Sequence, residues 1–496
     1  MLFCAFMLLS LYAATAHGQD FVCGYGLGGE EATVTYHKDR NFYRGNSPTQ
    51  KPIQVLPLFG KFKDMEVPEW MDLSSLLDRK GVGNQSSANL LNPTHKGSLA
   101  HFYNAMSYGA LSLRTHDSAV VGMWFESQET SLAGHGLNTA ADCDDPENPD
   151  SDIGGWSNAV KDFALDVVAA ADEKVDFNNY DGDGDGRVDM IAVFTPRAFG
   201  DLCGPQGTVL EHLGHETKDD FKKDTTRKIT VETIITSDHR GSFPFLVGVL
   251  AHEYGHAMGL PELYDRTNQS DDTDYPNHSA GIGYWGLMGR GNNGYMDTEG
   301  VWDGPAPLSA WSRIEVGWIA PQTVDEDDSL EIHDINSELG KVYKVQAFGG
   351  PEYFLLSNRQ NTYDGTASSV GSYYDDHAPE SGLLIWHIDE WTGSGIDVNI
   401  NELHKRVDVE CADGLWFDAN PLAPSTTLTE NSEEGGDNLD YWTPDDDYRM
   451  SRGGNIGDAT DVWDGLTYTE FTPYTNPSTY GYDGNRQDVF LSLIHI

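Results

Sequence analysis

The spacing of apolar residues along the chain changes at about residue 320. Before that point, short apolar runs alternate with segments whose apolar residues recur at helical spacing, a texture of strands mixed with helices. We expect buried strands at 54–62 and 189–196 and a helix over 98–113. These elements predict a first domain of the α+β class over residues 51–322.

Beyond the acidic linker at 324–329, the apolar residues follow strand-like patterns instead. The segments KVYKVQAF, EYFLLSNRQ and GLLIWHID read as strands separated by residues typical of turns. We therefore predict a β-rich, β-sandwich-like second domain over residues 323–496.

The N-terminus has the pattern of a targeting segment. An apolar run is followed by small residues, with Ala16 and Gly18 spaced as at a signal-peptide cleavage site. We predict a secretory signal peptide over 1–18 and a secreted, extracellular protein; a retained membrane anchor is the alternative. Residues 19–50 then form a short N-terminal segment and candidate propeptide.

Charge and length narrow the class of partner. The 496 residues suffice for more than one hydrophobic core, and 79 acidic against 31 basic side chains give a formal net charge of -48. Nucleic acids and anionic membranes would be repelled by such a chain. We expect a monomer that binds neither of them, and no membrane contact once the signal peptide is removed.

The cysteines fit an exported protein. Signal removal takes Cys4 and leaves Cys23, Cys143, Cys203 and Cys411, an even number that favours two disulfides with three possible pairings. A metal-covering latency role for Cys23 is the competing interpretation.

The segment PFLVGVLAHEYGHAMGLPELYD (244–265) predicts a metal site on a helix. His252 and His256 are four residues apart, so both imidazoles lie on one helix face and can reach one zinc ion. Glu253 lies beside them and is the candidate general base that takes a proton from water. Gly259 is the expected helix stop.

The third zinc ligand is expected after that stop. Glu262 stands three residues beyond Gly259, where a sharp turn returns the chain to the metal, and two histidines with a glutamate form a known hydrolytic set. Asp265 is the reserve candidate. The structural alternative is a buried helix whose histidines bond to backbone carbonyls. Downstream, GYWGLMGRG places Met288 in a glycine-rich turn that would underlie the metal.

The segment YDGDGDGRVD predicts a calcium loop. Asp181, Asp183, Asp185 and Asp189 alternate along a glycine-bent stretch, and oxygen ligands at that spacing suit Ca²⁺. A solvated acidic turn is the alternative. His387 lies in an apolar strand and is predicted to be a satisfied core histidine.

These motifs together resemble the immune inhibitor A family of secreted zinc metalloproteases. The resemblance rests on HEYGHAMGLPELYD, YWGLMGRG and PLSAWSRIEVGWI in order, and on VDFNNYDGDGDGRVDMIAVF upstream. It implies a metzincin-like catalytic domain followed by β-rich material, endopeptidase activity and stabilisation by calcium. It also implies His252 and His256 as zinc ligands and Glu253 as the catalytic acid/base. The family usually has aspartate where this chain has Glu262.

The leading hypothesis is a secreted zinc endopeptidase that hydrolyses extracellular proteins or peptides. One alternative is a catalytically silent, calcium-stabilised adhesion or carbohydrate-binding protein on a protease scaffold. Another is a zinc hydrolase that acts on something other than polypeptides. The intact Glu253 argues against the silent scaffold, because such a protein has no need of the base.

Overall fold

The structure is a computed structural model of the chain. The residues that it describes are 40–46, 51–67, 76–77, 84–85, 90–116, 123–131, 134, 153–196, 207–239, 243–264, 281–295, 304–324, 329–361, 371–393, 395, 398–401, 404–414, 457–484 and 489–493. The predicted signal peptide lies outside them.

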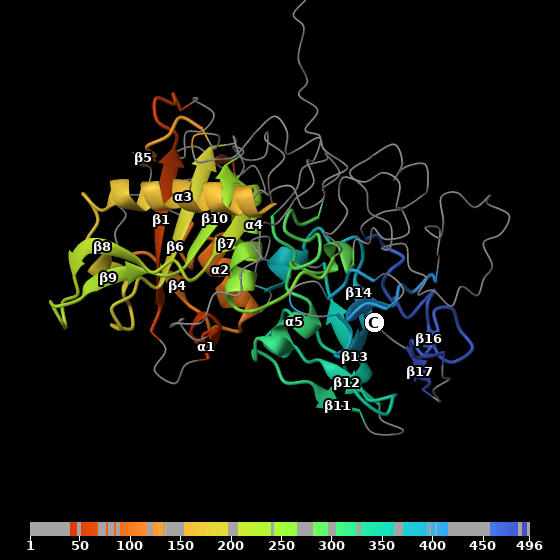
Figure 1. The fold of residues 1–496 in the computed structure, drawn as a ribbon. Coiled ribbons are helices and arrows are strands. Elements are labelled where there is room, and N and C mark those ends of the chain that lie inside the picture. Colours follow the sequence, from red (N-terminus) through yellow and green to blue (C-terminus); the bar gives the residue numbers. More distant parts are fainter. Residues whose placement is uncertain are drawn as a thin grey trace, which may run out of the picture.

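A six-stranded sheet forms the centre of the N-terminal half (Figure 1). Its order is β4 (Leu113–Arg114), β1 (Ile53–Lys61), β6 (Met190–Pro196), β10 (Ile234–His239) and β7 (Gly207–Leu210), with β5 (Trp124–Glu126) also on β1. All pairs are parallel except β10 with β7, so an antiparallel strand closes one edge. The strands predicted at 54–62 and 189–196 are confirmed as β1 and β6.

Helices cover both faces of this sheet. Because side chains alternate along a strand, β1 sends Leu56 and Leu58 to one cluster of buried side chains and Val55 and Phe59 to another. Helix α3 (Ile153–Ala171) covers the first face, and α2 (Leu99–Met106) and α4 (Phe243–Ala257) cover the second. The mixture of helices and strands predicted for this half is confirmed, and the sheet is mostly parallel with helices on both faces. The metzincin-like detail stays a prediction.

Helix α2 is shorter than the predicted helix over 98–113. Ser98 caps its start by accepting the His101 N–H. At its end, Tyr108 takes a left-handed φ of 54°, and the N–H groups of Tyr108 and Gly109 bond back to Ala105 and Asn104. The residues that follow pair with β1 as β4, so the extended prediction was wrong after residue 106.

The C-terminal half contains a five-stranded sheet in the order β11 (Gln322–Thr323), β12 (Tyr343–Val345), β13 (Glu352–Arg359), β14 (Gly382–Asp389) and β15 (Val407–Val409). Strand β13 points Tyr353 and Leu355 into the cluster that contains α4, and Phe354 and Leu356 into a separate cluster. The pair β16 (Glu470–Phe471) and β17 (Leu491–Ser492) contributes to that separate cluster. The β-rich texture is confirmed. A full two-sheet sandwich and the limits of the two domains stay predictions.

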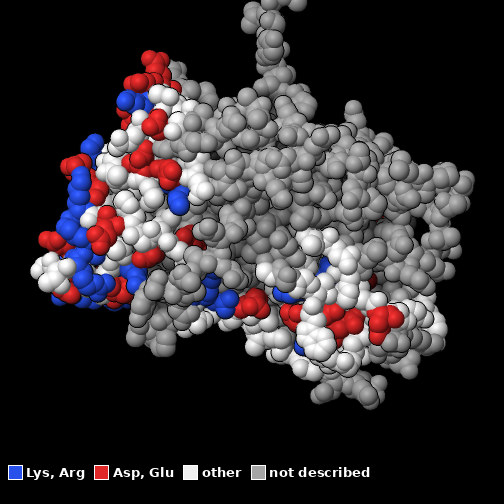
Figure 2. Space-filling view, viewed as in Figure 1, with Lys and Arg blue, Asp and Glu red and all other residues white. Residues whose placement is uncertain are grey.

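Short elements complete the described chain. They are α1 (Arg40–Tyr43), β2 (Leu76–Leu77), β3 (Asn84–Gln85), η4 (Phe177–Tyr180), β8 (His215–Asp220), β9 (Lys228–Val231), η7 (Gly283–Trp285), α5 (Ala310–Glu315) and η9 (Gly371–Asp375). Lys and Arg side chains gather over the β8–β9 hairpin of this acidic protein (Figure 2). Among the helices in the described ranges, none has both the length and the apolar character needed to cross a bilayer.

Candidate metal centre

Helix α4 carries the HExxH motif and is buried on nearly all sides. Its segment is strongly apolar, with Pro244 in the first turn, where a missing N–H costs nothing. It ends at Gly259, whose φ of 92° is the predicted left-handed stop. The N–H groups of Gly259 and Leu260 then bond back to His256 and Gly255. This turn brings residues 260–264 back along the helix.

The turn places Glu262 against both histidines. The His252 Nε2 atom lies 3.2 Å from His256 Nε2 and 3.2 Å from Glu262 Oε2, and His256 Nε2 lies 3.3 Å from Glu262 Oε1. All three side chains are 0% exposed. The structure therefore brings together the three predicted zinc ligands, which come from two turns of α4 and the segment after it.

Backbone carbonyls orient the two imidazoles. His256 Nδ1 lies 2.8 Å from the Leu260 carbonyl, and His252 Nδ1 lies 3.0 Å from the Leu287 carbonyl. A carbonyl only accepts, so each Nδ1 carries the proton and each Nε2 keeps a lone pair facing its neighbours. This is the tautomer that a metal ligand requires.

Burial also sets the charges of the site. It lowers the pKa of His256, and the attraction of Glu262 opposes this only in part, so the ring is neutral. Burial alone would raise the pKa of Glu262, but the attraction of His256 and His252 in their charged forms outweighs it and holds that pKa well below its usual value, so the carboxylate is ionised and attracts a cation. Neutral imidazoles and an ionised carboxylate are the forms that bind zinc.

The donor spacing fits a tetrahedral zinc ion. Bonds of about 2.0–2.1 Å at tetrahedral angles put neighbouring ligand atoms roughly 3.3 Å apart. The separations of 3.2, 3.2 and 3.3 Å match one face of such a tetrahedron. In addition, the buried Oε1 atom of Glu262 accepts no hydrogen bond, as a metal-ligating oxygen would. Within the described residues three donors converge, which is the number of protein ligands typical of catalytic zinc.

Of the two candidates for the third ligand, the structure describes one. Glu262 points into the site, while Asp265 lies outside the described residues. This chain has Glu262 where the similar family usually has aspartate. Glu262 still reaches the site, because both of its carboxylate oxygens lie within 3.3 Å of an imidazole nitrogen.

Glu253 is directed toward the edge strand of the sheet. Its Oε1 atom lies 2.7 Å from the point where a Cβ on Gly207 would stand, so glycine at the start of β7 makes room for the carboxylate. Its negative charge also reaches Tyr103, whose pKa is raised by burial first and by Glu253 second. Glu253 is 0% exposed, like the three ligand candidates.

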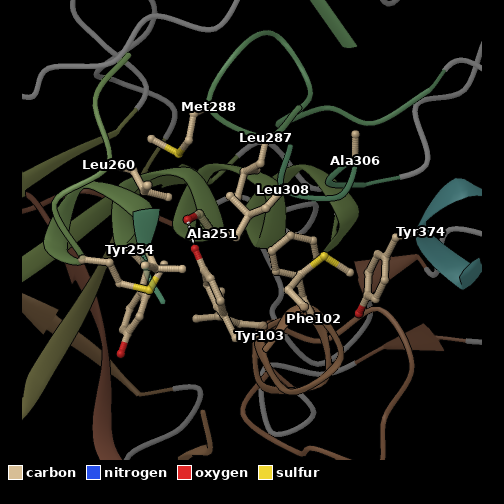
Figure 3. Packing of buried hydrophobic residues seen from close by; sticks show 14 of the residues in the cluster. Phe102, Tyr103, Ala251, Tyr254, Leu260, Leu287, Met288, Ala306, Leu308 and Tyr374 are labelled. Carbon is tan, nitrogen blue, oxygen red and sulfur yellow. Dashed lines mark hydrogen bonds between the residues drawn. The ribbon is translucent and has the colours of Figure 1, made fainter. Parts of the chain in front are cut away.

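The glycine-rich turn lies next to the helix, as predicted. Met288 is buried beside α4 (Figure 3). Its sulfur packs against Gly255, which stands between the two histidines in the sequence. The turn is held from the C-terminal half: Arg359 of β13 donates to the Trp285 carbonyl at 3.0 Å, and the Trp285 indole donates to Asp461 at 2.7 Å. The same turn supplies the Leu287 carbonyl that orients His252.

Helix α2 supports α4 from below. Figure 3 shows Phe102 and Tyr103 pointing up against α4, with the Tyr103 hydroxyl bonded to the Ala251 carbonyl. Tyr103 and Tyr254 also pack at 4.8 Å between ring centroids. The helix face opposite the ligands is thereby fixed.

The predicted calcium loop is brought together in part. Asp181, Asp183 and Asp185 place carboxylate oxygens within 4.8 Å of one another. Asp189 is not in this group: its two oxygens accept the backbone N–H groups of Gln54 at 2.9 Å and Gly182 at 3.1 Å. Asp189 fastens the loop to β1 instead.

The cysteine predictions fall largely outside the described residues. Cys23, Cys143 and Cys203 are not described, and Cys411 is buried as a reduced thiol. No disulfide is present within the described ranges, and the predicted pairing stays untested.

Sequence reasoning missed the groups that orient the ligands. The carbonyls of Leu260 and Leu287 carry no sequence signal, because every residue has one. Arg40 and Arg44, which bond to the end of α4, stand more than 200 positions before it. The glycine-rich turn GLMG was the one sequence signal that backbone groups lie close to the candidate metal site.

Comparison with known proteins supports the peptidase assignment. Residues 207–319, which contain β7, α4 and the glycine-rich turn, match the family model described as immune inhibitor A peptidase M6, catalytic domain. No curated protein sequence matches the chain significantly.

Solved structures of OgpA from Akkermansia muciniphila are also similar to this chain. One wild-type crystal structure shares 14% identity with this chain, and the match covers 69% of this chain and 85% of that one, with a TM-score of 0.27. A second wild-type crystal structure shares 16% identity, and the match covers 62% of this chain and 72% of that one, with a TM-score of 0.26. Catalytically inactive OgpA in complex with an O-glycopeptide (glycodrosocin) substrate shares 15% identity, covers 69% of this chain and 85% of its own, and has a TM-score of 0.27. The family match confirms the resemblance predicted from the sequence: residues 207–319 are similar to the catalytic domain of the immune inhibitor A peptidases M6.

Proposed function

We propose that the protein is a zinc-dependent endopeptidase with Glu253 as its general base. The observation that carries the proposal is the convergence of His252 Nε2, His256 Nε2 and the Glu262 carboxylate on one tetrahedral face. A structural zinc site would be closed by a fourth protein ligand, whereas three ligands with an open position are typical of hydrolytic zinc.

The residues divide the chemistry between them. Zinc, when bound, supplies a Lewis acid that polarises a peptide carbonyl and lowers the pKa of water. Glu253 takes the proton of the attacking water and delivers it to the leaving amine. It directly follows His252 on α4, and its carboxylate lies against Gly207. The carbonyls of Leu260 and Leu287 keep both imidazoles in the metal-binding tautomer.

The substrate is proposed to be protein or peptide outside the cell. Export is supported by the predicted signal peptide over 1–18 and by the acidic composition, which suits a highly soluble protein. Because the four site residues are 0% exposed, a peptide has to gain access before it is cleaved. An activity test therefore examines both the chemistry and that access.

The decisive experiment measures cleavage of unfolded casein by the mature chain, with and without a chelator, beside Glu253→Gln. We expect the variant to retain stoichiometric zinc and to lose roughly 10²- to 10⁴-fold in kcat, because only the proton acceptor is removed. Glu216→Gln is the matched control, an exposed glutamate beside a histidine in EHLGHE. Its activity should equal that of the wild type.

The same assay tests the silent-scaffold alternative. Equal inertness of the wild type and Glu253→Gln, with zinc bound to both, would favour a non-catalytic protein on a protease scaffold. Cleavage of a small amide but not of casein would favour a zinc hydrolase with another substrate class.

We also propose that Ca²⁺ stabilises the loop of Asp181, Asp183 and Asp185. Three carboxylates within 4.8 Å of one another repel unless a cation neutralises them. Gly186, with a φ of 93°, gives the loop its sharp turn, and its N–H donates to Asp181 Oδ2 at 3.0 Å.

A further inference from the structure

The C-terminal end of the metal-binding helix is capped by two arginines from far upstream. A helix leaves its last carbonyls without intrahelical partners. Arg40 Nη1 donates to the carbonyls of His256 at 2.7 Å and Ala257 at 2.6 Å, and Arg44 Nε donates to Met258 at 2.8 Å. One of the capped carbonyls belongs to a zinc-ligand candidate itself.

Charge strengthens this cap. The aligned peptide dipoles give the C-terminus of a helix a partial negative charge, which cations stabilise. Arg40 also pairs with Glu211, directly after β7, at 3.0 Å. This ion pair fixes the guanidinium between the helix end and the edge strand against which Glu253 lies.

Further contacts dock the rest of segment 40–46 on the same region. Tyr254, the residue between Glu253 and Gly255, points away from the ligands and donates to the Tyr43 carbonyl at 3.0 Å. The Trp318 indole donates to the Arg44 carbonyl at 2.6 Å. Tyr43 is 2% exposed, so the segment is part of the core.

We propose that Arg40 and Arg44 are positioning residues of the metal centre and that segment 40–46 stays with the mature protein. The inference rests on the zinc site proposed above. The two arginines fix the last turn of α4 and the start of the turn that returns Glu262, and thereby the angle between His256 and Glu262. Any removable propeptide must then end before Arg40, inside the predicted 19–50 segment.

The test measures the zinc affinity of the full mature chain, by competition with a chromogenic chelator, for Arg40→Met, Arg44→Met and the double variant. Met keeps an apolar stem of similar shape near the backbone and removes the guanidinium donors. Co²⁺ substitution gives a second readout, because its visible absorption reports ligand geometry. We expect the double variant to bind zinc tenfold to about a hundredfold more weakly, as for other outer groups that orient metal ligands, and to change the Co²⁺ band.

Arg406→Met is the matched control. Arg406 is half-buried and donates to two backbone carbonyls, those of Thr392 and Gly393, in the C-terminal half. The Arg406→Met variant should have a lower melting temperature than the wild type, while its zinc affinity and Co²⁺ spectrum should stay at wild-type values. Arg40→Lys should recover part of the lost affinity, because it keeps the charge but not the fork that spans two carbonyls.

A double variant with wild-type zinc affinity and an unchanged Co²⁺ spectrum would overturn the proposal, whatever its melting temperature. If the double variant does not fold, the zinc affinities of the single variants and N-terminal sequencing of the secreted protein test the proposal instead. A mature N-terminus beyond residue 46 in an active preparation would equally refute it. A wild type that binds zinc but cleaves nothing would contradict the proposed function and leave this measurement intact.

Discussion

Within the described residues, two buried clusters of histidine and glutamate differ in how their donor atoms are arranged. In the metal centre, His252, His256 and Glu262 are 0% exposed and point their donor atoms at one another. In the C-terminal sheet, His387 is 4% exposed and lies between Glu352 and Glu410, at 2.8 Å and 2.9 Å from its two ring nitrogens.

The direction of the ring nitrogens explains the difference. At the metal centre each Nδ1 faces a carbonyl, so each Nε2 keeps its lone pair. His387 faces a carboxylate on both sides, so both nitrogens carry protons. Burial alone would lower the pKa of His387, but the bonds to Glu352 and Glu410 outweigh it and raise the pKa to about 9. One cluster is suited to bind a metal ion and the other holds a proton.

The largest expected effect is on zinc affinity, and it distinguishes the two clusters directly. His256→Ala removes one of the three proposed zinc ligands, and we expect zinc affinity to fall by more than about 10³-fold. His387→Gln should leave zinc affinity within about twofold of the wild type. Chelator competition on both variants makes the comparison, and a similar loss in both would show that the clusters are coupled.

The next effect tests the carboxylate of the metal centre. Glu262→Gln keeps the shape but removes the charge, and we expect roughly 100-fold weaker zinc binding because a neutral amide is a poor zinc ligand. Glu410→Gln is the matched change at the other cluster. Full zinc affinity in Glu262→Gln would transfer the role of third ligand to Asp265.

The sequence predicted the convergence of His252, His256 and Glu262 because helical spacing fixes local geometry. His252 and His256 must share a face on any regular helix, and Gly259 announces the return that brings Glu262 back. The position of His387 in an apolar strand correctly predicted a satisfied core histidine. Its partners could not be predicted, because Glu352 lies on β13 and Glu410 directly after β15, and pairing of separate strands decides which side chains meet.

The same limit applies to the fold. Strands β1 and β6 were predictable from continuous apolar runs. The end of α2 was overlooked, although Gly109, whose φ of 84° continues the left-handed turn begun by Tyr108, marks it in the sequence. Asp189 fits the calcium pattern in sequence but bonds to the backbone of β1, a contact that exists only in the folded sheet.

A third prediction concerns pH and stability. The pKa of His387 is raised from 6.5 to about 9 on folding, so its contribution to stability is fully present below pH 6.5 and is lost as pH rises through 9. The shift corresponds to at most about 3 kcal/mol. Urea unfolding of the zinc-free chain between pH 6 and 10 measures it.

His387→Gln is the control for this pH dependence. The variant should be less stable at pH 6 and should lose most of the decline between pH 6.5 and 9. An unchanged decline would mean that other titratable groups cause it.

The smallest expected effect concerns the acidic loop, where carboxylates converge without a histidine. Asp181 already accepts the N–H groups of Gly184 at 2.8 Å and Asp185 at 2.9 Å, so the loop keeps its shape without an ion and calcium adds only a modest gain. With millimolar affinity or somewhat better, about 10 mM Ca²⁺ should stabilise the chain by roughly 1–2 kcal/mol.

Thermal unfolding with and without Ca²⁺ should show this stabilisation in the wild type and not in Asp181→Asn. The control Asp224→Asn changes an aspartate in the neighbouring hairpin that accepts the Thr226 N–H at 3.1 Å, and it should retain the shift. Equal shifts in both variants would mean that calcium acts elsewhere, and that converging carboxylates alone do not define an ion site in this protein.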